Sequence, residues 1–374
     1  MAKDQQDTPT RRGTGTDDAS LKGLVIELAR LCTPILIGLA VAVGVHHFFA
    51  LPRLGFPAEV RRLITIASSL DTGLLKGDEP VAVIISNSAG VEGIDAAIVQ
   101  EAAPKGWRVL NFSTNGTNQV EARLLADRLA DAGADLVIWL FRPDLLGTIR
   151  PMHADVVYAY AEGDFAQELP WVSPPWVDDS TMSQLEAGSF EVSLHFRRRW
   201  LDAINSEMRR RMRTGIRAPE ADEFEAPFNL EIMLDGAKLD RHLGEISNMM
   251  GDELEGFHAE GLGTGRAFVA EMVGDFAKRS AELAIVIAPT HPQLNEQFEP
   301  VEVEVLSFLK PLADAKGLRV GSAAGLLEAS QYADAIHPNE SGRDTLSRWL
   351  GGWMPPPPAR TKPPARTKPP ARTK

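Results

Sequence analysis

Short apolar runs rich in β-branched residues recur along the chain and define its folded part. Each of the first three is followed by a polar loop and then by a segment with helical spacing of apolar residues. Strands that are apolar at every position are typical of a parallel sheet covered on both faces. The repeated order of strand, loop and helix therefore predicts a doubly wound α/β fold with its functional site at the carboxyl ends of the strands. The expected strands are 81–85, 107–112, 135–141, 283–288 and 318–321.

Helical periodicity fills most of the intervals between these runs. The expected helices of the sheet domain are 93–102, 119–132, 266–279, 301–316 and 341–350.

The segment from about 148 to 264 interrupts this rhythm. It contains a turn-rich aromatic stretch at 169–176, a strongly basic helix at 190–213 and a weaker helix at 239–250. We interpret it as a mostly helical insertion that caps the sheet. Its basic face either meets an anionic phospholipid or polymer or pairs with neighbouring acidic side chains, and the sequence leaves both alternatives open.

The N-terminal region is predicted to anchor the chain in a membrane. Residues 1–20 are polar and expected to be disordered. The stretch 31–51 is almost wholly apolar and about long enough to cross a bilayer, and a helix at 57–75 is expected to link it to the domain. Basic residues on both sides favour a cytoplasmic N-terminus only weakly. A cleaved signal peptide and a buried core helix are the alternatives.

This arrangement predicts a single-pass protein of the inner, or cytoplasmic, membrane. The folded domain is then expected outside the cytoplasm, in the periplasm.

Charge and cysteine content exclude several classes of protein. The formal net charge of the 374 residues is −12, although the tail from Met354 onward carries only basic charges. The rest of the chain is more acidic still, which argues against a nucleic-acid partner. The single cysteine, Cys32, excludes an intrachain disulfide and any multi-cysteine metal site. The tail, 354–374, repeats Pro-Pro-Ala-Arg-Thr-Lys and is expected to be disordered.

An acid and a histidine near the C-terminus are the strongest signal of chemistry. Asp334 and His337 are followed by Pro-Asn and a turn glycine, so one loop can present both side chains to a cleft. In serine hydrolysis an imidazole takes the hydroxyl proton, and a carboxylate holds the imidazole in the required tautomer. A serine that follows a buried strand, Ser88, supplies the nucleophile. Alone, Ser-Asn-Ser after a strand is also a common helix cap.

Together, in this order, the motifs resemble those of the SGNH (GDSL-like) hydrolase superfamily over about residues 78–350, the insertion excepted. The family has a flavodoxin-like three-layer sandwich with a mainly parallel sheet. The resemblance implies that Ser86-Asn87-Ser88 is the nucleophile motif and that Asp334 and His337 complete a triad with Ser88. It also implies an oxyanion hole formed by the backbone N–H groups of Ser88 and Gly116.

One block departs from the family pattern. After the third strand the family has Gly-x-Asn-Asp, whose asparagine donates to the oxyanion, whereas this chain has Phe141-Arg142-Pro143-Asp144. Losing such a donor weakens stabilisation of the transition state. Either Arg142 or Asn118 takes its place, or the reaction differs from that of a simple esterase.

The resemblance implies a membrane-anchored, extracytoplasmic O-acyltransferase or acylesterase that acts on a cell-surface polysaccharide without a cofactor or metal. Its partners would be the glycan or acyl ester and a membrane-bound O-acyltransferase. One alternative is a non-catalytic scaffold or glycan-binding protein that serves such an acyltransferase. The other is a simple lipase or esterase.

Overall fold

The structure is a computed structural model that describes residues 77–146, 234–259 and 263–358, together with isolated positions elsewhere. The chain divides into two compact units, Met1–Gly55 and Phe56–Lys374. In the first unit only Cys32 and Thr33 are described, so the fold discussed below is that of the second.

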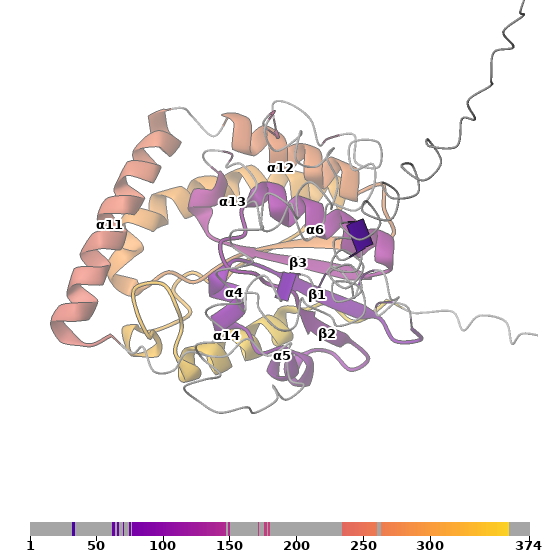
Figure 1. Ribbon diagram of the computed structural model, residues 1–374, viewed down its shortest axis with the longest axis horizontal. Helices are drawn as coiled ribbons and strands as arrows, with labels where there is room; N and C mark the ends of the chain where they lie inside the picture. The colour runs from indigo at the N-terminus through magenta and orange to yellow at the C-terminus, as the bar shows by residue number, and fades with distance from the viewer. Residues whose placement is uncertain are drawn as a thin grey trace, which may run out of the picture. The chain divides into compact units, whose positions relative to one another are not determined.

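Five strands form one parallel sheet in the order β2-β1-β3-β4-β5 (Figure 1). Hydrogen bonding sets Val83 of β1 opposite Leu110 of β2 on one side and Val137 of β3 on the other. The predicted parallel α/β sheet is confirmed, and each strand lies within one residue of its expected bounds. The strands are β1 (Val81–Ile85), β2 (Arg108–Asn111), β3 (Leu136–Phe141), β4 (Glu282–Ile287) and β5 (Arg319–Ser322).

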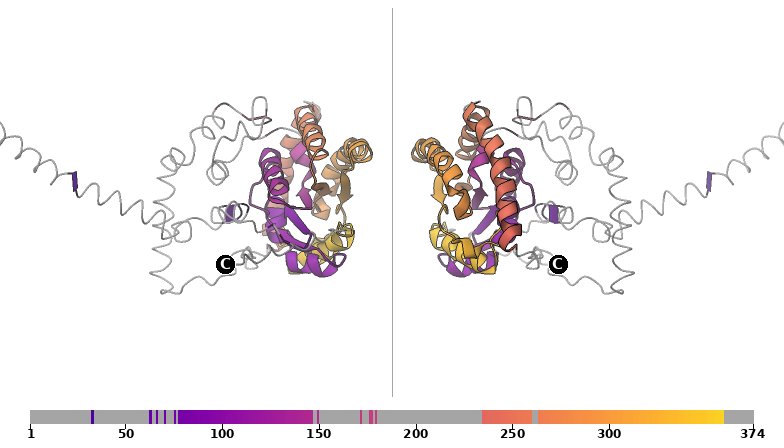
Figure 2. Two further views of the ribbon diagram at one scale, coloured as in Figure 1. Left: turned by 90° about the vertical axis from the view of Figure 1, so that its right-hand side faces the viewer. Right: turned by 90° about the vertical axis from the view of Figure 1, so that its left-hand side faces the viewer.

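Alternate residues of the buried strands feed two separate apolar cores. Val83 and Ile285 point into one core, and Ile84 and Val286 into the other. Each such side chain, once buried, contributes roughly 1.5–3 kcal/mol to folding, which is why every position of β1 and β3 is apolar. Helices cover both faces of the sheet (Figures 1 and 2).

The first core lies under α6 (Gln119–Ala132), α12 (Gly263–Phe276) and α13 (Asn295–Lys316). The second lies under α5 (Ala96–Ala102) and α14 (Glu340–Trp353), which run side by side below the sheet in Figure 1.

Four helices near the sheet differ from the expected bounds. Helix α12 begins and ends three residues early and α14 ends three residues late, and the other two differ more. The segment predicted as a single helix at 93–102 is two short helices, α4 (Ser88–Gly93) and α5. The side chain of Asp95 accepts from the N–H groups of Ala97 and Ile98. It therefore caps α5 and starts a new helix two residues after α4 ends. Helix α13 begins at Asn295, ahead of the expected start at 301.

The last part of the predicted insertion is the long helix α11 (Gly236–Ala259), which extends beyond the expected bounds at both ends. Its Leu243 and Ile246 form a small third core with Leu294, Phe298 and Ala335. Helix α11 is therefore packed against the loop that carries Asp334. Most of the insertion before residue 234, including the predicted basic helix, lies outside the described residues.

Several predicted segments fall wholly or mostly outside the described part of the chain, namely 1–20, 31–51 and the end of the tail from 359. Among the helices that can be described, none has the length and apolar character needed to cross a bilayer. Within the predicted helix 57–75, Leu63, Ile66 and Leu70 are described, and all three are helical and buried.

The first residues of the predicted tail pack against the domain. Met354 is buried, and the indole N–H of Trp107 donates to the carbonyl of Pro355 at 2.7 Å.

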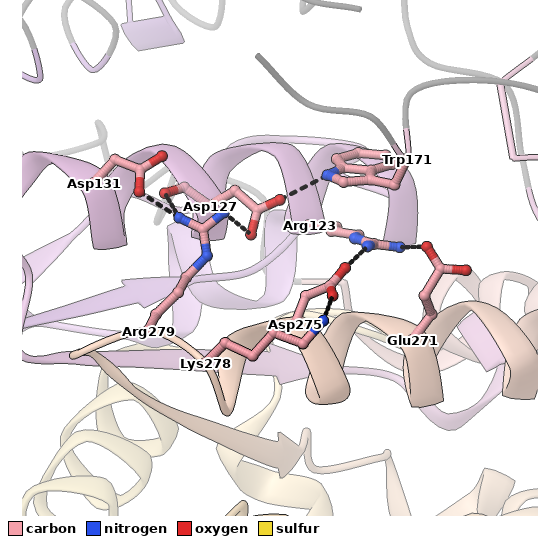
Figure 3. Close-up of polar contacts among 8 residues, drawn as sticks. All are labelled: Arg123, Asp127, Asp131, Trp171, Glu271, Asp275, Lys278 and Arg279. Carbon is pink, nitrogen blue, oxygen red and sulfur yellow. Dashed lines mark hydrogen bonds and ion pairs between the residues drawn. The ribbon is translucent and has the colours of Figure 1, made fainter. Parts of the chain in front are cut away.

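A network of charged side chains joins α6 to α12 (Figure 3). The guanidinium of Arg123 has no exposed area, and it bonds Glu271 at 3.2 Å and Asp275 at 2.7 Å. It also lies 4.3 Å from the ring centre of Trp171, a residue of the predicted insertion. Burial lowers the pKa of Arg123, and the surrounding carboxylates act in the opposite direction.

The same network continues through Asp127 of α6 (Figure 3). The indole N–H of Trp171 donates to one oxygen of Asp127 at 2.7 Å, and Arg279 pairs with the other at 3.2 Å. Burial raises the pKa of Asp127, and Arg279 and Trp171 oppose this shift. The network thus ties the insertion and α12 to the sheet domain.

Candidate active site

The loop before α14 holds Asp334 and His337 in direct contact. One carboxylate oxygen of Asp334 accepts a hydrogen bond from His337 Nδ1 at 2.8 Å. The other accepts from the backbone N–H groups of Ile336 and His337, both at 2.7 Å. The carboxylate therefore holds the proton of the imidazole on Nδ1, which leaves Nε2 as the acceptor in the neutral ring.

Electrostatics keeps the acid ionised and the imidazole basic. Burial alone would raise the pKa of Asp334, but the bonds from His337 and the backbone amides lower it to about 2. For His337, burial alone would lower the pKa, but Asp334 and then Glu92 outweigh it and raise the pKa above its usual value. The charge of Arg142 opposes this rise.

The Pro-Asn and Gly that follow the histidine fix the shape of the loop. Asn339 caps α14 through its side-chain oxygen, and its side-chain N–H group donates to the Ser330 carbonyl at 2.8 Å. A Cβ on Gly342 would lie 2.2 Å from the backbone oxygen of Gln331, so only glycine allows this approach. These motif residues position His337 and do not take part in proton transfer.

Ser88 is the first residue of α4, immediately beyond β1. The side chain of Asn87 accepts from the N–H of Ala89 at 3.0 Å, which starts the helix at this point. A Cβ on Gly90 would lie 2.3 Å from the Cβ of Ser86, so the glycine lets α4 fold back closely on the strand end. The side chain of Asn111 donates to the Gly90 carbonyl and anchors the helix from β2.

Helix α4 lies against the histidine loop. A carboxylate oxygen of Glu92 is 4.0 Å from His337 Nδ1, and a Cβ on Gly93 would lie 3.1 Å from the ring of Pro338. Ser88 and Glu92 are four positions apart and so share one face of the helix. His337 Nε2 makes no hydrogen bond within the described part of the chain, so the bond to Ser88 Oγ is not formed in this structure. Catalytic hydrogen bonds often form only when substrate is bound.

Besides Ser88, three residues were predicted as donors to the oxyanion, and two of them lie apart from the acid–histidine pair. Gly116 is exposed in a turn at φ 75°, and its loop is joined to the end of β1 by a bond from Thr114 N–H to the Ser86 carbonyl. Asn118 is buried, and its side-chain oxygen caps α6 by accepting from Glu121 N–H at 3.0 Å. Neither residue has a described contact with Ser88 or His337.

Arg142 is the predicted residue that does reach the site. It follows β3, and it lines a small pocket together with Ala89 and Ile336, the direct chain neighbours of Ser88 and His337. Strands β1 and β3 flank the point where the strand order reverses, which is where doubly wound proteins bind their ligands.

Two residues near the site carry no assignment from sequence reasoning. Glu92 faces His337, as described above, and His291 follows β4 and lines the same pocket as Arg142. Burial lowers the pKa of His291, and the charge of Asp334 opposes the shift. The place of His291 after a strand, at the carboxyl edge of the sheet, was the one signal in the sequence that could have marked it.

In the residues that the structure describes, no group of three or more His, Cys, Asp or Glu side chains is arranged to hold a metal ion. The fold and the site are thus those of a doubly wound α/β protein with a partly buried acid–histidine pair beside the short helix α4. The chain matches no protein-family model and no curated protein sequence.

Proposed function

We propose that this protein is a serine-dependent O-acyltransferase or acylesterase of the SGNH type, with a flavodoxin-like sandwich, that acts on acyl groups of a cell-surface polysaccharide. The observation that carries the proposal is the Asp334–His337 pair, whose imidazole has one nitrogen held by the acid and the other unpaired. This pair lies beside the helix that begins at Ser88.

The proposed reaction uses these groups in turn. His337 Nε2 takes the hydroxyl proton of Ser88 while the oxygen attacks the acyl carbonyl, and Asp334 stabilises the imidazolium that forms. The leaving alcohol takes the proton from His337, and the acyl group remains as an ester on Ser88. A sugar hydroxyl or water then loses its proton to His337 and attacks this ester. The bond to Ser88 Oγ breaks, His337 returns the proton to this oxygen, and the product is released.

The membrane anchor and periplasmic location belong to the same proposal, and they rest on the apolar stretch 31–51. A membrane-bound O-acyltransferase is the partner that would deliver acyl groups across the membrane to the glycan.

A serine-directed fluorophosphonate tests the proposal on the full-length chain in detergent. We expect covalent label on Ser88, mapped by peptide mass spectrometry, and its loss in Ser88→Ala and His337→Ala. Ser307→Ala is the matched control, because Ser307 is exposed on α13. Folded protein that stays unlabelled would contradict the proposal.

A non-catalytic scaffold for such an acyltransferase is the second candidate. The missing asparagine after β3 and the unformed hydrogen bond between Ser88 and His337 favour it. Full glycan modification in cells that carry Ser88→Ala or His337→Ala would support the scaffold and exclude the enzyme. Turnover of short esters with water as the sole acceptor would instead indicate a simple lipase or esterase.

A further inference from the structure

A small pocket borders the candidate site between α11, α13 and the histidine loop. Most of its wall is apolar, and its polar side chains include those of Arg142 and His291. Ala89 connects the pocket to Ser88, and Ile336 connects it to His337. The pocket wall therefore includes the direct chain neighbours of both candidate catalytic residues. The residues used in the argument below are Ala89, Arg142, Ile246, His291, Phe298 and Ile336.

His291 contributes a buried hydrogen-bond donor to this pocket. The residue is 1% exposed, and its ring stands edge-on to that of Tyr332 with the centroids 4.9 Å apart. Its Nδ1 accepts from the N–H of Gln293 at 3.3 Å, so the proton of the neutral ring is on Nε2. This Nε2 has no hydrogen-bond partner in the described part of the chain.

An unpaired buried donor costs about 1–3 kcal/mol, and such groups in native proteins commonly await a ligand or water. Because burial lowers the pKa of His291, the ring is neutral at pH 7 and donates one hydrogen bond without adding charge. A neutral donor suits a carbonyl oxygen.

The size of the pocket limits what it can hold. The cavity volume is about 20 Å³, and a single water molecule needs roughly 10–15 Å³. Ile246 from α11 and Phe298 from α13 line the pocket, and both are buried. This leaves room for a methyl-sized group beside a carbonyl, and the pocket is too small to enclose a long acyl chain.

We propose that this pocket receives an acetyl-sized acyl group esterified to Ser88, and that His291 Nε2–H donates to its carbonyl oxygen, the role that an asparagine after β3 has in the SGNH family. The proposal rests on the serine chemistry proposed above and adds the substrate class and a donor. His291 keeps its proton throughout, so no bond to it forms or breaks. The donor would be worth most when the carbonyl oxygen becomes an oxyanion.

The first test of the pocket compares fluorophosphonates that carry a methyl or an octyl group on phosphorus, with the full-length chain. We expect the methyl reagent to label Ser88 at least about tenfold faster than the octyl reagent. Phe298→Ala and Ile246→Ala each enlarge the pocket and should bring the labelling rates of the two reagents closer together. Val303→Ala, a truncation at an exposed position of α13, should leave the ratio unchanged.

The second test measures the donor with 4-nitrophenyl acetate as substrate. We expect His291→Ala to lower kcat by about 10²- to 10³-fold with KM changed far less, because an oxyanion donor acts in the transition state. His291→Gln, which keeps an N–H donor, should recover part of the loss. Melting curves of both variants separate a loss of kcat from a loss of folded protein. If His291 only packs the core, both variants should lose stability, and neither should show a selective loss of kcat over KM.

The outcomes distinguish the two proposals. Absence of Ser88 labelling by either reagent overturns the proposed function and, with it, the pocket. Equal labelling by methyl and octyl reagents, or an unchanged kcat in folded His291→Ala, overturns the pocket proposal and leaves the serine chemistry standing.

Discussion

Two clusters of buried polar groups in this protein differ in what their side chains meet. In the network between α6 and α12, both terminal nitrogens of Arg123 meet carboxylates and Asp127 meets Trp171 and Arg279, although Arg123 Nε and Asp127 Oδ1 make no hydrogen bond in the described residues (Figure 3). In the site at the strand ends, His337 Nε2 and His291 Nε2 are buried with no partner in the described residues.

This difference separates a structural cluster from a functional one. Paired buried charges hold elements together, and removing one partner leaves the others uncompensated. Unpaired buried groups cost stability, and they persist where a ligand completes them. We therefore expect substitutions in the α6–α12 network to change stability with little effect on turnover, and substitutions in the site to do the reverse.

The largest effect is expected at the proposed nucleophile and base. Ser88→Ala and His337→Ala should each lower kcat for 4-nitrophenyl acetate by about 10⁴-fold or more. Their melting temperatures should stay close to that of the parent, because Ser88 and His337 are only partly buried. Turnover retained in either variant would contradict the functional role assigned to the site.

The next effect concerns the tautomer of the imidazole. Asp334→Asn keeps the shape of the side chain but can donate to Nδ1, which would place the ring proton on Nε2 and remove the base. We expect kcat to fall by about 10³- to 10⁴-fold. Asp344→Asn, on the exposed face of α14, is the matched control and should retain parent activity.

A stability effect is expected in the α6–α12 network. Arg123→Met should lower the free energy of unfolding by about 2–4 kcal/mol, because Glu271 and Asp275 lose their buried partner. Urea denaturation measures the loss, and turnover by the folded protein should change little. Arg348→Met removes an exposed pair with Asp344 and should leave the free energy of unfolding nearly unchanged. A turnover defect in a stable Arg123→Met protein would contradict the structural role.

The smallest effect is expected at Glu92, and it appears in the pH profile. This carboxylate helps to raise the pKa of His337, so it delays deprotonation of the base as pH increases. Glu92→Gln should therefore move the acid limb of kcat/KM to lower pH and increase the relative activity below neutrality. An acid limb that stays in place, or moves to higher pH, would show that Glu92 does not act on the base.

Much of the fold could be predicted because its signal is local. The five strands lie within one residue of their expected bounds, since burial on both faces makes β1 and β3 apolar at every position. The helix boundaries needed information that is not local. The helix expected from 301 begins at Asn295 instead, because Phe298 is buried against α11, and this burial offsets the hydrogen bond lost at Pro300 inside α13.

The candidate site was predicted only where a motif marks it. Asp334 and His337 share one loop, so their spacing in sequence was enough to predict their contact. The contact of Glu92 with His337 depends on how α4 folds back over the strand end, and the place of His291 depends on the strand order. No periodicity or spacing in the sequence contains the contact of Glu92, and for His291 the one signal is its place after an expected strand. The oxyanion roles of Gly116, Asn118 and Arg142 stay predictions.

The most direct test of the central claim is intact-mass spectrometry of the full-length chain, quenched with acid shortly after mixing with 4-nitrophenyl acetate. The account predicts a gain of one acetyl group, located on Ser88 by peptide mapping, and no such species in Ser88→Ala or in His337→Ala. Turnover of the ester without any acetylated Ser88, or acetylation that persists unchanged in His337→Ala, would contradict it.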